Sequence, residues 1–318
     1  MVEFGYKLSS EEHGPRALVR LAARAEQAGF AFASISDHFH PWIDDQGHAP
    51  FVWSVLGGVS EATENLRVLT GVTCPTIRTH PAIVAHAAAT AAVMLPGRFA
   101  LGVGSGENLN EHILGDRWPE VDVRLEMLEE AVEVMRALWD GGLTSHHGRH
   151  YTVENARLYD LPEERPPVLV AAGGSKAVEL AGRIGDGLVS LAPAEGLLER
   201  FDEAGGRGKP RYAEVNVCWA TDEDEARRTA HRLWPIAGMK GQLSQELPVP
   251  SHFSQAAETV RVEDVVETVA CGPDPEAHIE NAKKFLDAGY DHIWFHQIGP
   301  DQEGFFGFYE REVLPRLR

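Results

Sequence analysis

The segment from Ser36 to Trp42 places a carboxylate, an imidazole and an indole close together in the chain. Asp37, His38 and Trp42 directly follow residues 30–35, an apolar run that is typical of a buried strand. An imidazole exchanges protons near neutral pH, a carboxylate beside it tunes that exchange, and an indole can form an aromatic wall. We therefore predict a proton-handling pocket where this strand ends.

Polar side chains recur at the ends of other predicted strands. Glu11 or Glu12 follows the first strand, Glu107 follows the fourth, and His296 ends the eighth. A solvated loop charge is the simpler explanation for any one of them, but the repeated position favours one shared site. In barrels of repeated strand–helix units, the carboxyl ends of the strands carry the chemistry.

Two glycine-rich segments lie at equivalent predicted positions. Residues 102–106 lead directly into Glu107, and Gly173 and Gly174 lead into a predicted helix that contains Lys176. Glycine lets a backbone approach a flat ring or a phosphate closely, and the N-terminus of a helix favours an anion. Both segments therefore predict ligand contacts, and an ordinary tight turn is the alternative for each.

Strand-like and helix-like segments alternate along the chain, which predicts an α/β fold of the (β/α)8 barrel (TIM barrel) class in one domain, residues 1–318. A doubly wound sheet is the alternative, but residues 9–15 after the first strand lack its glycine fingerprint. The predicted strands are residues 4–8, 30–35, 66–72, 98–103, 167–172, 187–191, 211–220 and 291–297. The predicted helices are residues 15–28, 51–61, 81–95, 121–139, 175–184, 222–234, 275–288 and 305–314.

Two segments interrupt this alternation and predict insertions after the fourth and seventh strands. Residues 141–160 contain Tyr151, Val153 and Leu158 and predict a small hairpin. Residues 235–260 are rich in Pro, Gln, Ser and His, and we expect them to be irregular. Long loops in compact domains are usually functional, so we expect this second insertion to cover a site.

The charge and composition limit the partners and the location of the protein. The formal net charge of −19 disfavours binding to nucleic acid or to an anionic membrane, which both need basic patches. No apolar run reaches the roughly 18 residues of a membrane helix, and the N-terminus shows no signal-peptide pattern. The three cysteines are far apart and fit no disulfide framework, so we expect a cytoplasmic protein. We expect its partner to be a small-molecule substrate.

Several irregular motifs together resemble the luciferase-like superfamily. Within it, the chain resembles oxidoreductases that use the deazaflavin coenzyme F420, in the family named after the F420-dependent glucose-6-phosphate dehydrogenase. The resemblance covers nearly the whole chain and implies a luciferase-like barrel and a homodimer. The motifs are Ser36-Asp37-His38-Phe39 with Pro41-Trp42, Gly47-His48-Ala49-Pro50-Phe51, Pro75-Thr76-Ile77-Arg78 with His80-Pro81, Gly104-Ser105-Gly106-Glu107 with Asn110-Glu111, Ala171-Ala172-Gly173-Gly174, and Ala181-Gly182-Arg183 with Gly185-Asp186-Gly187.

The resemblance implies roles for the residues that match. His38 is then the general acid or base that faces the substrate carbon, Glu107 handles the coenzyme's own proton, Trp42 walls the reaction centre, and Glu11 lies nearby. The bond between Gly71 and Val72 matches a position where this superfamily often has a non-proline cis peptide. The residues implied to bind the coenzyme are Asp37, Gly71, Val72, Cys74, Ser105, Gly106, Asn110, Gly173, Gly174, Lys176 and Ala177.

The chain departs from the sugar-phosphate members of that family. Their phosphate-binding cations fall here at Ala194, Ser244 and Thr268, none of which is charged. A phosphate dianion binds poorly without a cation, so we expect an alcohol, aldehyde or ketone substrate rather than glucose 6-phosphate. Lys240 and Arg261 are the cations that could replace the missing ones.

Other functions are compatible with parts of the pattern. The first alternative is an FMN-dependent monooxygenase of the same superfamily, and the pair Asp37–His38 together with Glu107 favours the deazaflavin enzyme over it. The fifteen histidines show no ligand spacing, so we predict no metal site, although a barrel hydrolase with scattered ligands leaves no motif. A pure binding protein is the weakest alternative because it needs no acid and base groups together.

Overall fold

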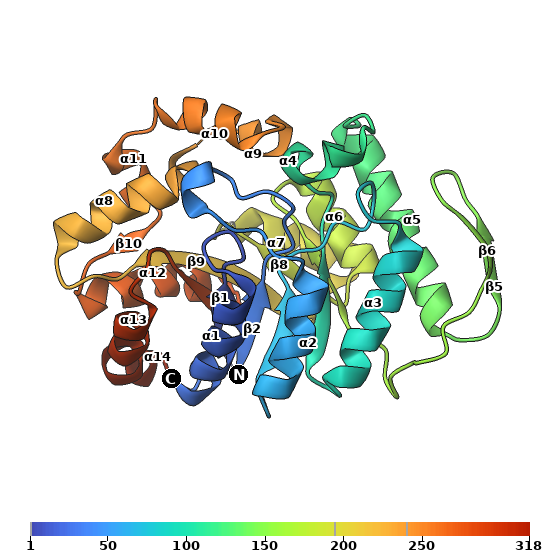
Figure 1. Ribbon diagram of the computed structural model, residues 1–318, viewed down its shortest axis with the longest axis horizontal. Helices are drawn as coiled ribbons and strands as arrows, with labels where there is room; N and C mark the ends of the chain where they lie inside the picture. The colour runs from blue at the N-terminus through green and yellow to red at the C-terminus, as the bar shows by residue number, and fades with distance from the viewer. Residues whose placement is uncertain (1, 194, 240) are drawn as a thin grey trace.

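The computed structural model describes residues 2–193, 195–239 and 241–318, and its centre is a closed barrel of parallel strands (Figure 1). Adjacent strands pair in parallel, and β9 pairs with both β8 and β11, which closes the ring through β11 and β1. The predicted (β/α)8 barrel is therefore confirmed. Its strands are β1 (Glu3–Leu8), β2 (Phe32–Ile35), β3 (Arg67–Thr70), β4 (Phe99–Val103), β7 (Val168–Ala171), β8 (Gly187–Ser190), β9 (Arg211–Cys218) and β11 (His292–Gln297), and a short β10 (Ala270–Cys271) pairs with β9.

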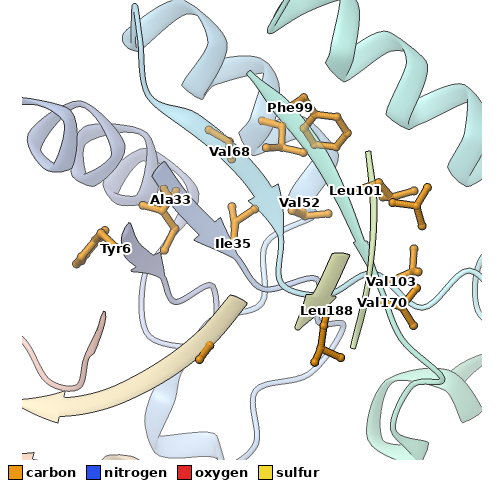
Figure 2. Close-up of a cluster of buried hydrophobic side chains, with 14 of the residues drawn as sticks. Tyr6, Ala33, Ile35, Val52, Val68, Phe99, Leu101, Val103, Val170 and Leu188 are labelled. Carbon is orange, nitrogen blue, oxygen red and sulfur yellow. The ribbon is translucent and has the colours of Figure 1, made fainter. Parts of the chain in front are cut away.

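Helices cover the outside of the barrel because the outward-facing side chains of the strands are apolar. Figure 2 shows Ala33, Ile35, Val68 and Leu101 in this buried layer. Proline occupies the first turn of α1, α3 and α12, where its missing N–H is not needed. The covering helices are α1 (Pro15–Gln27), α2 (Val52–Ala62), α3 (Pro81–Met94), α5 (Val121–Trp139), α6 (Ser175–Ile184), α7 (Glu195–Phe201), α8 (Glu223–Leu233), α12 (Pro275–Ala288) and α13 (Gln302–Phe308).

The inward-facing side chains fill the barrel. Phe32, Leu69, Leu169, Val189 and Trp294 form a separate buried cluster on the other face of the strands. Successive side chains of a strand point to opposite faces, so these residues alternate with the outer layer. The packed interior leaves the carboxyl-terminal rim of the strands as the place for a site.

Both predicted insertions are present. The first contains a hairpin of β5 (Thr144–His147) and β6 (Thr152–Ala156), as expected. The second was expected to be irregular, and this is wrong, because it forms short helices: η4 (Pro235–Gly238), α9 (Leu243–Glu246) and α10 (Pro250–Ala257), followed by α11 (Val262–Val266). These helices are too short to show a periodic pattern. In Figure 1 they lie at the same end of the molecule as α4 (Asn108–Glu111).

The third strand is shorter than predicted. It ends at Thr70 instead of residue 72, and the bond between Gly71 and Val72 is a non-proline cis peptide. This confirms the backbone feature that the resemblance implied. Among the described residues, no helix is long and apolar enough to cross a membrane.

Candidate active site

Glu11 and His38 form an acid–imidazole pair at the ends of the first two strands. His38 Nε2 lies 3.6 Å from Glu11 Oε1, and Glu11 is only 2% exposed. The hydroxyls of Ser36 and Ser9 donate hydrogen bonds of 2.6 and 3.2 Å to the Glu11 carboxylate. Burial alone would raise the pKa of Glu11, but His38, Lys7 and the Ser36 hydroxyl lower it to about 2. Glu11 is therefore ionised at neutral pH and can stabilise a proton on His38.

Trp42 forms one wall beside this pair. Its ring lies 5.0 Å from the His38 ring, centroid to centroid, and 5.3 Å from the ring of Phe253 on α10. Phe253 is fully buried in an apolar cluster with Ile43 and Leu109, against which Trp42, Ile236, Met239 and Leu247 pack. The second insertion thus contacts the predicted reaction centre through apolar side chains.

Glu107 begins the short helix that follows β4. Its carbonyl accepts hydrogen bonds from the backbone N–H groups of Asn110 and Glu111, at 3.1 and 3.2 Å. Gly106 before it has a φ of 80°, and a Cβ there would lie 2.6 Å from Cys74 Sγ, so only glycine fits. The Glu107 side chain is half-buried, and among the described residues it has no hydrogen-bond or ion-pair partner. Its carboxylate is therefore available to a ligand.

Asn110 connects the His38 loop to the Glu107 helix. Its side-chain oxygen accepts hydrogen bonds from the backbone N–H groups of Phe39 and His40, at 2.9 and 3.2 Å. Its side-chain nitrogen is buried and has no partner among the described residues. His38 and Glu107, which the sequence analysis assigns to one site, thus lie on adjoining segments of the rim, and Asn110 offers a spare donor there.

Asp37, Arg78 and Glu111 form a buried charge cluster beneath these segments. Arg78 Nη2 lies 3.0 Å from Asp37 Oδ1, and Arg78 Nε lies 3.5 Å from Glu111 Oε1. Thr73 donates a hydrogen bond of 2.8 Å to the other Asp37 oxygen. Burial raises the pKa of Glu111 to about 7 although Arg78 opposes the shift. Arg78 and Glu111 had no predicted role, and the one sequence signal for them is that both occur in the quoted motifs.

Three further residues implied to bind the coenzyme lie at the end of β3. A side chain at Gly71 would overlap the Ser34 hydroxyl, and Lys7 Nζ donates a hydrogen bond of 3.2 Å to the Gly71 carbonyl. Val72 packs against the cluster that fills the barrel. Cys74 is buried beside Thr76, and burial raises the pKa of its thiol well above the usual value, so it is a neutral packing group.

The second glycine segment opens onto free space. A Cβ added at Gly173 or Gly174 would meet no atom within 4 Å, and Ser105 at the first glycine segment is half-buried. Lys176 Nζ lies 2.7 Å from Asp122 Oδ1 on α5, and both side chains are mostly exposed. Ala177 packs partly against the core. The backbone at the start of α6 is thus accessible, and the nearby Lys176 is already paired with Asp122.

The positions that bind phosphate in sugar-phosphate members carry no cation where they are described. Thr268 donates a hydrogen bond to the Val265 carbonyl, and Ser244 lies in α9. Arg261 is 72% exposed and forms an ion pair with Asp264 at 2.8 Å, so its charge is already partnered at the surface. Ala194 and Lys240 lie outside the described residues.

His296 near the end of β11, predicted at the rim, contacts Glu12, which follows β1. It is fully buried, and its ring nitrogens contact Asn216 Oδ1 at 3.0 Å and Glu12 Oε2 at 2.8 Å. Nearby, Lys7 pairs with Glu214 inside the barrel at 3.0 Å. Asn216, Glu214 and Lys7 were not predicted as members of this network, because they lie on β9 and β1, which are far apart in the sequence. Among the described residues, no group of His, Cys, Asp and Glu side chains is arranged to hold a metal ion.

Comparison with known proteins agrees with this architecture. The F420-dependent glucose-6-phosphate dehydrogenases of Microbacterium testaceum and Rhodococcus erythropolis are 36% and 37% identical, and each match covers 100% of this chain and 98% of the relative. The solved structure of an F420-dependent secondary alcohol dehydrogenase in complex with an F420–acetone adduct superposes with a TM-score of 0.93 at 31% identity, over 100% of this chain and 99% of that one. An F420-dependent tetrahydromethanopterin reductase from Methanopyrus kandleri has a TM-score of 0.82 over 100% of this chain and 99% of that one; at 23% identity it supports the fold alone.

The family model described as luciferase-like monooxygenase matches residues 2–292. This match and the full-length relatives confirm the resemblance seen in the sequence motifs. The chain therefore belongs to the luciferase-like monooxygenase family.

Proposed function

We propose that this protein is a coenzyme F420-dependent oxidoreductase that transfers a hydride between the deazaflavin and an alcohol or carbonyl substrate. The observation that carries the proposal is the Glu11–His38 pair on one segment of the barrel rim and, on the adjoining segment, the Glu107 carboxylate, which has no partner among the described residues. The full-length relatives are named as F420-dependent enzymes, and so is the structural neighbour at 31% identity. These names support the coenzyme.

The described residues fit such a coenzyme. Within the described part of the chain, the buried side-chain nitrogen of Asn110 has no partner, and Gly173 and Gly174 border open space at the N-terminus of α6, where backbone N–H groups favour an anion. These residues, with the backbone near Gly71 and Gly106, would hold the coenzyme. When bound, it supplies a carbon that accepts or gives hydride.

The residues of the chain supply the proton chemistry. In this proposal His38 Nε2 accepts the proton of a substrate hydroxyl while hydride leaves the carbon that carries that hydroxyl, and a carbonyl forms. The ionised Glu11 stabilises the resulting imidazolium, because opposite charges 3.6 Å apart favour the protonated ring. Trp42 and Phe253 exclude water from this position. We assign Glu107 to the proton that the coenzyme itself exchanges.

The residues around the Trp42 wall favour an uncharged, largely apolar substrate. Phe253 of the insertion is buried against Trp42, with Ile236, Met239 and Leu247 packed around it, and the described phosphate positions carry no cation. A sugar phosphate has no charge partner among these residues. Two relatives named for glucose 6-phosphate are similar over their full length, but the lining supports a simple alcohol or ketone, as in the name of the structural neighbour.

The test is a substrate and cofactor panel with purified protein. We expect F420 to bind, and we expect it to be reduced by secondary alcohols but not by glucose 6-phosphate. A His38→Ala variant should bind the coenzyme normally and lose turnover by roughly 10²-fold or more. Efficient oxidation of glucose 6-phosphate would overturn the substrate class. Bound FMN with oxygen-dependent turnover would instead support a monooxygenase.

We also propose a cytoplasmic homodimer. The three cysteines of the chain are free, which fits a reducing compartment. Phe51, Ile83 and Met94 are 62%, 60% and 42% exposed, and they line or adjoin hollows of about 540 and 300 Å³ on the outer side of α1, α2 and α3. An apolar surface of this kind is usually covered by a partner, and we assign it to a second copy. Light scattering tests this: Ile83→Glu should give monomers, and an unchanged dimer would place the interface elsewhere.

A further inference from the structure

Arg78 connects the two segments that carry the proposed acid and base groups. Its Nη2 donates hydrogen bonds of 3.0 Å to the Asp37 carboxylate and 3.1 Å to the Asp37 carbonyl, immediately before His38. Its backbone N–H donates a hydrogen bond of 2.8 Å to the Glu111 carboxylate, on the helix that begins after Glu107. The Arg78 side chain is 9% exposed, so water screens these contacts little.

We propose that Arg78 is a positioning residue of this active site, which fixes the separation of His38 and Glu107 by holding Asp37 on one segment and Glu111 on the other. This inference rests on the proposed function. Asn110 makes a second link between the same segments, but it contacts backbone N–H groups of residues 39 and 40 rather than a charge. Arg78 is therefore the charged link, and a guanidinium suits it because its planar fork can contact two carboxylates at once.

Glu111 is the half of this link that responds to pH. It is 1% exposed and faces Arg78 and Cys74 from the segment after β3, Asp37 from the segment after β2, Tyr151 before β6, and Glu107 on its own helix. Burial raises the pKa of Glu111 to about 7, against the effect of Arg78. Above neutral pH Glu111 is thus mostly ionised and pairs with Arg78, and below neutral pH Glu111 is mostly protonated. The contact at 3.5 Å between Arg78 Nε and Glu111 strengthens when Glu111 ionises.

The first experiment compares Arg78→Lys with Arg98→Lys in the full-length protein loaded with F420. Lysine keeps the charge at position 78 but cannot reach both carboxylates. Arg98 is the matched control, because it donates hydrogen bonds to the Thr63 hydroxyl and the Leu66 carbonyl at the opposite end of the barrel. We expect R78K to slow single-turnover hydride transfer at least about tenfold, since a ~1 Å misplacement can cost roughly 10²-fold in rate. R98K should stay within about twofold of the wild type.

A second measurement does not depend on activity. Hydrogen exchange should accelerate in residues 37–42 and 107–111 of R78K and remain unchanged there in R98K. Equal exchange in the wild type and R78K, or equal hydride-transfer rates, would overturn the inference. A wild type that turns over no alcohol would refute the proposed function, and the exchange data would still decide the role of Arg78.

If R78K does not fold, the variant Glu111→Gln tests the inference instead. Glutamine keeps an oxygen for the Arg78 N–H but carries no charge. We expect E111Q to match the wild-type rate near pH 6, where Glu111 is mostly protonated, and to be at least about threefold slower near pH 8. A residue with only a structural role would change the rate by the same factor at both pH values. A constant ratio between the rates of E111Q and the wild type would therefore refute the inference.

Discussion

Replacing Glu11 with glutamine removes one charge from the proposed catalytic dyad and changes its shape little. The variant keeps an oxygen that can accept the hydrogen bond from Ser36, but it loses the attraction to His38 and Lys7. Those attractions lower the pKa of Glu11 to about 2 in the folded protein, from about 4.5 in the unfolded chain. Because Glu11 is 2% exposed, solvent screening reduces this difference little.

The size and sign of the effect follow from linkage. One pKa unit corresponds to about 1.4 kcal/mol, so a shift from about 4.5 to about 2 contributes about 3 kcal/mol to stability. A lowered carboxylate pKa stabilises the folded protein above the unfolded pKa, and this contribution is lost as pH falls from about 4.5 to about 2. We therefore expect E11Q to be less stable than the wild type by up to about 3 kcal/mol at neutral pH, and the difference to vanish near pH 2.

Urea unfolding of both proteins at a series of pH values measures this difference directly. The kinetic counterpart is a fall in kcat/KM of roughly 10²-fold, because the His38 imidazolium loses its counter-ion. A Glu64→Gln variant, at an exposed carboxylate, is the control and should change neither quantity. A difference in stability that stays constant from neutral pH to pH 3 would refute the electrostatic reasoning.

Three further predictions concern packing and the coenzyme. Phe253→Ala should cost roughly 3–5 kcal/mol in unfolding experiments and raise KM for small alcohols, because Phe253 is fully buried against the Trp42 wall. Gly115→Ala should lower stability by ~1 kcal/mol, and Gly106→Ala should lower it by at least about twice as much. Both glycines have positive φ, but only a Cβ at Gly106 would clash with Cys74. Equal losses would contradict the predicted clash. Lys176→Ala should weaken coenzyme binding about threefold and reduce its salt dependence in fluorescence titrations, and unchanged affinity would remove Lys176 from the site.

Local patterns in the sequence predicted most of the architecture. Pro15 and Gly29 bracket α1 much as expected, and the alternation of strands and helices predicted the barrel that the structure confirms. The residues that follow strands, including His38 and Glu107, also lie at the rim. Such predictions succeed because turn chemistry and strand–helix periodicity depend on neighbours in the sequence. Local patterns did not predict the short helices of the second insertion, because these helices are held by tertiary contacts such as the one between Phe253 and Trp42.

The sequence by itself determined the fold class and the family resemblance, and it predicted which segments would carry the chemistry. The resemblance implied that Glu11 lies near His38, but only the tertiary structure decided that Arg78 joins Asp37 to Glu111 and that Lys176 pairs with Asp122. These pairs join residues from separate strands and helices, so no local pattern records them. Their ionisation depends on burial and on neighbours brought together by folding, which is why Glu11 and Glu111, both buried glutamates, have pKa values shifted in opposite directions.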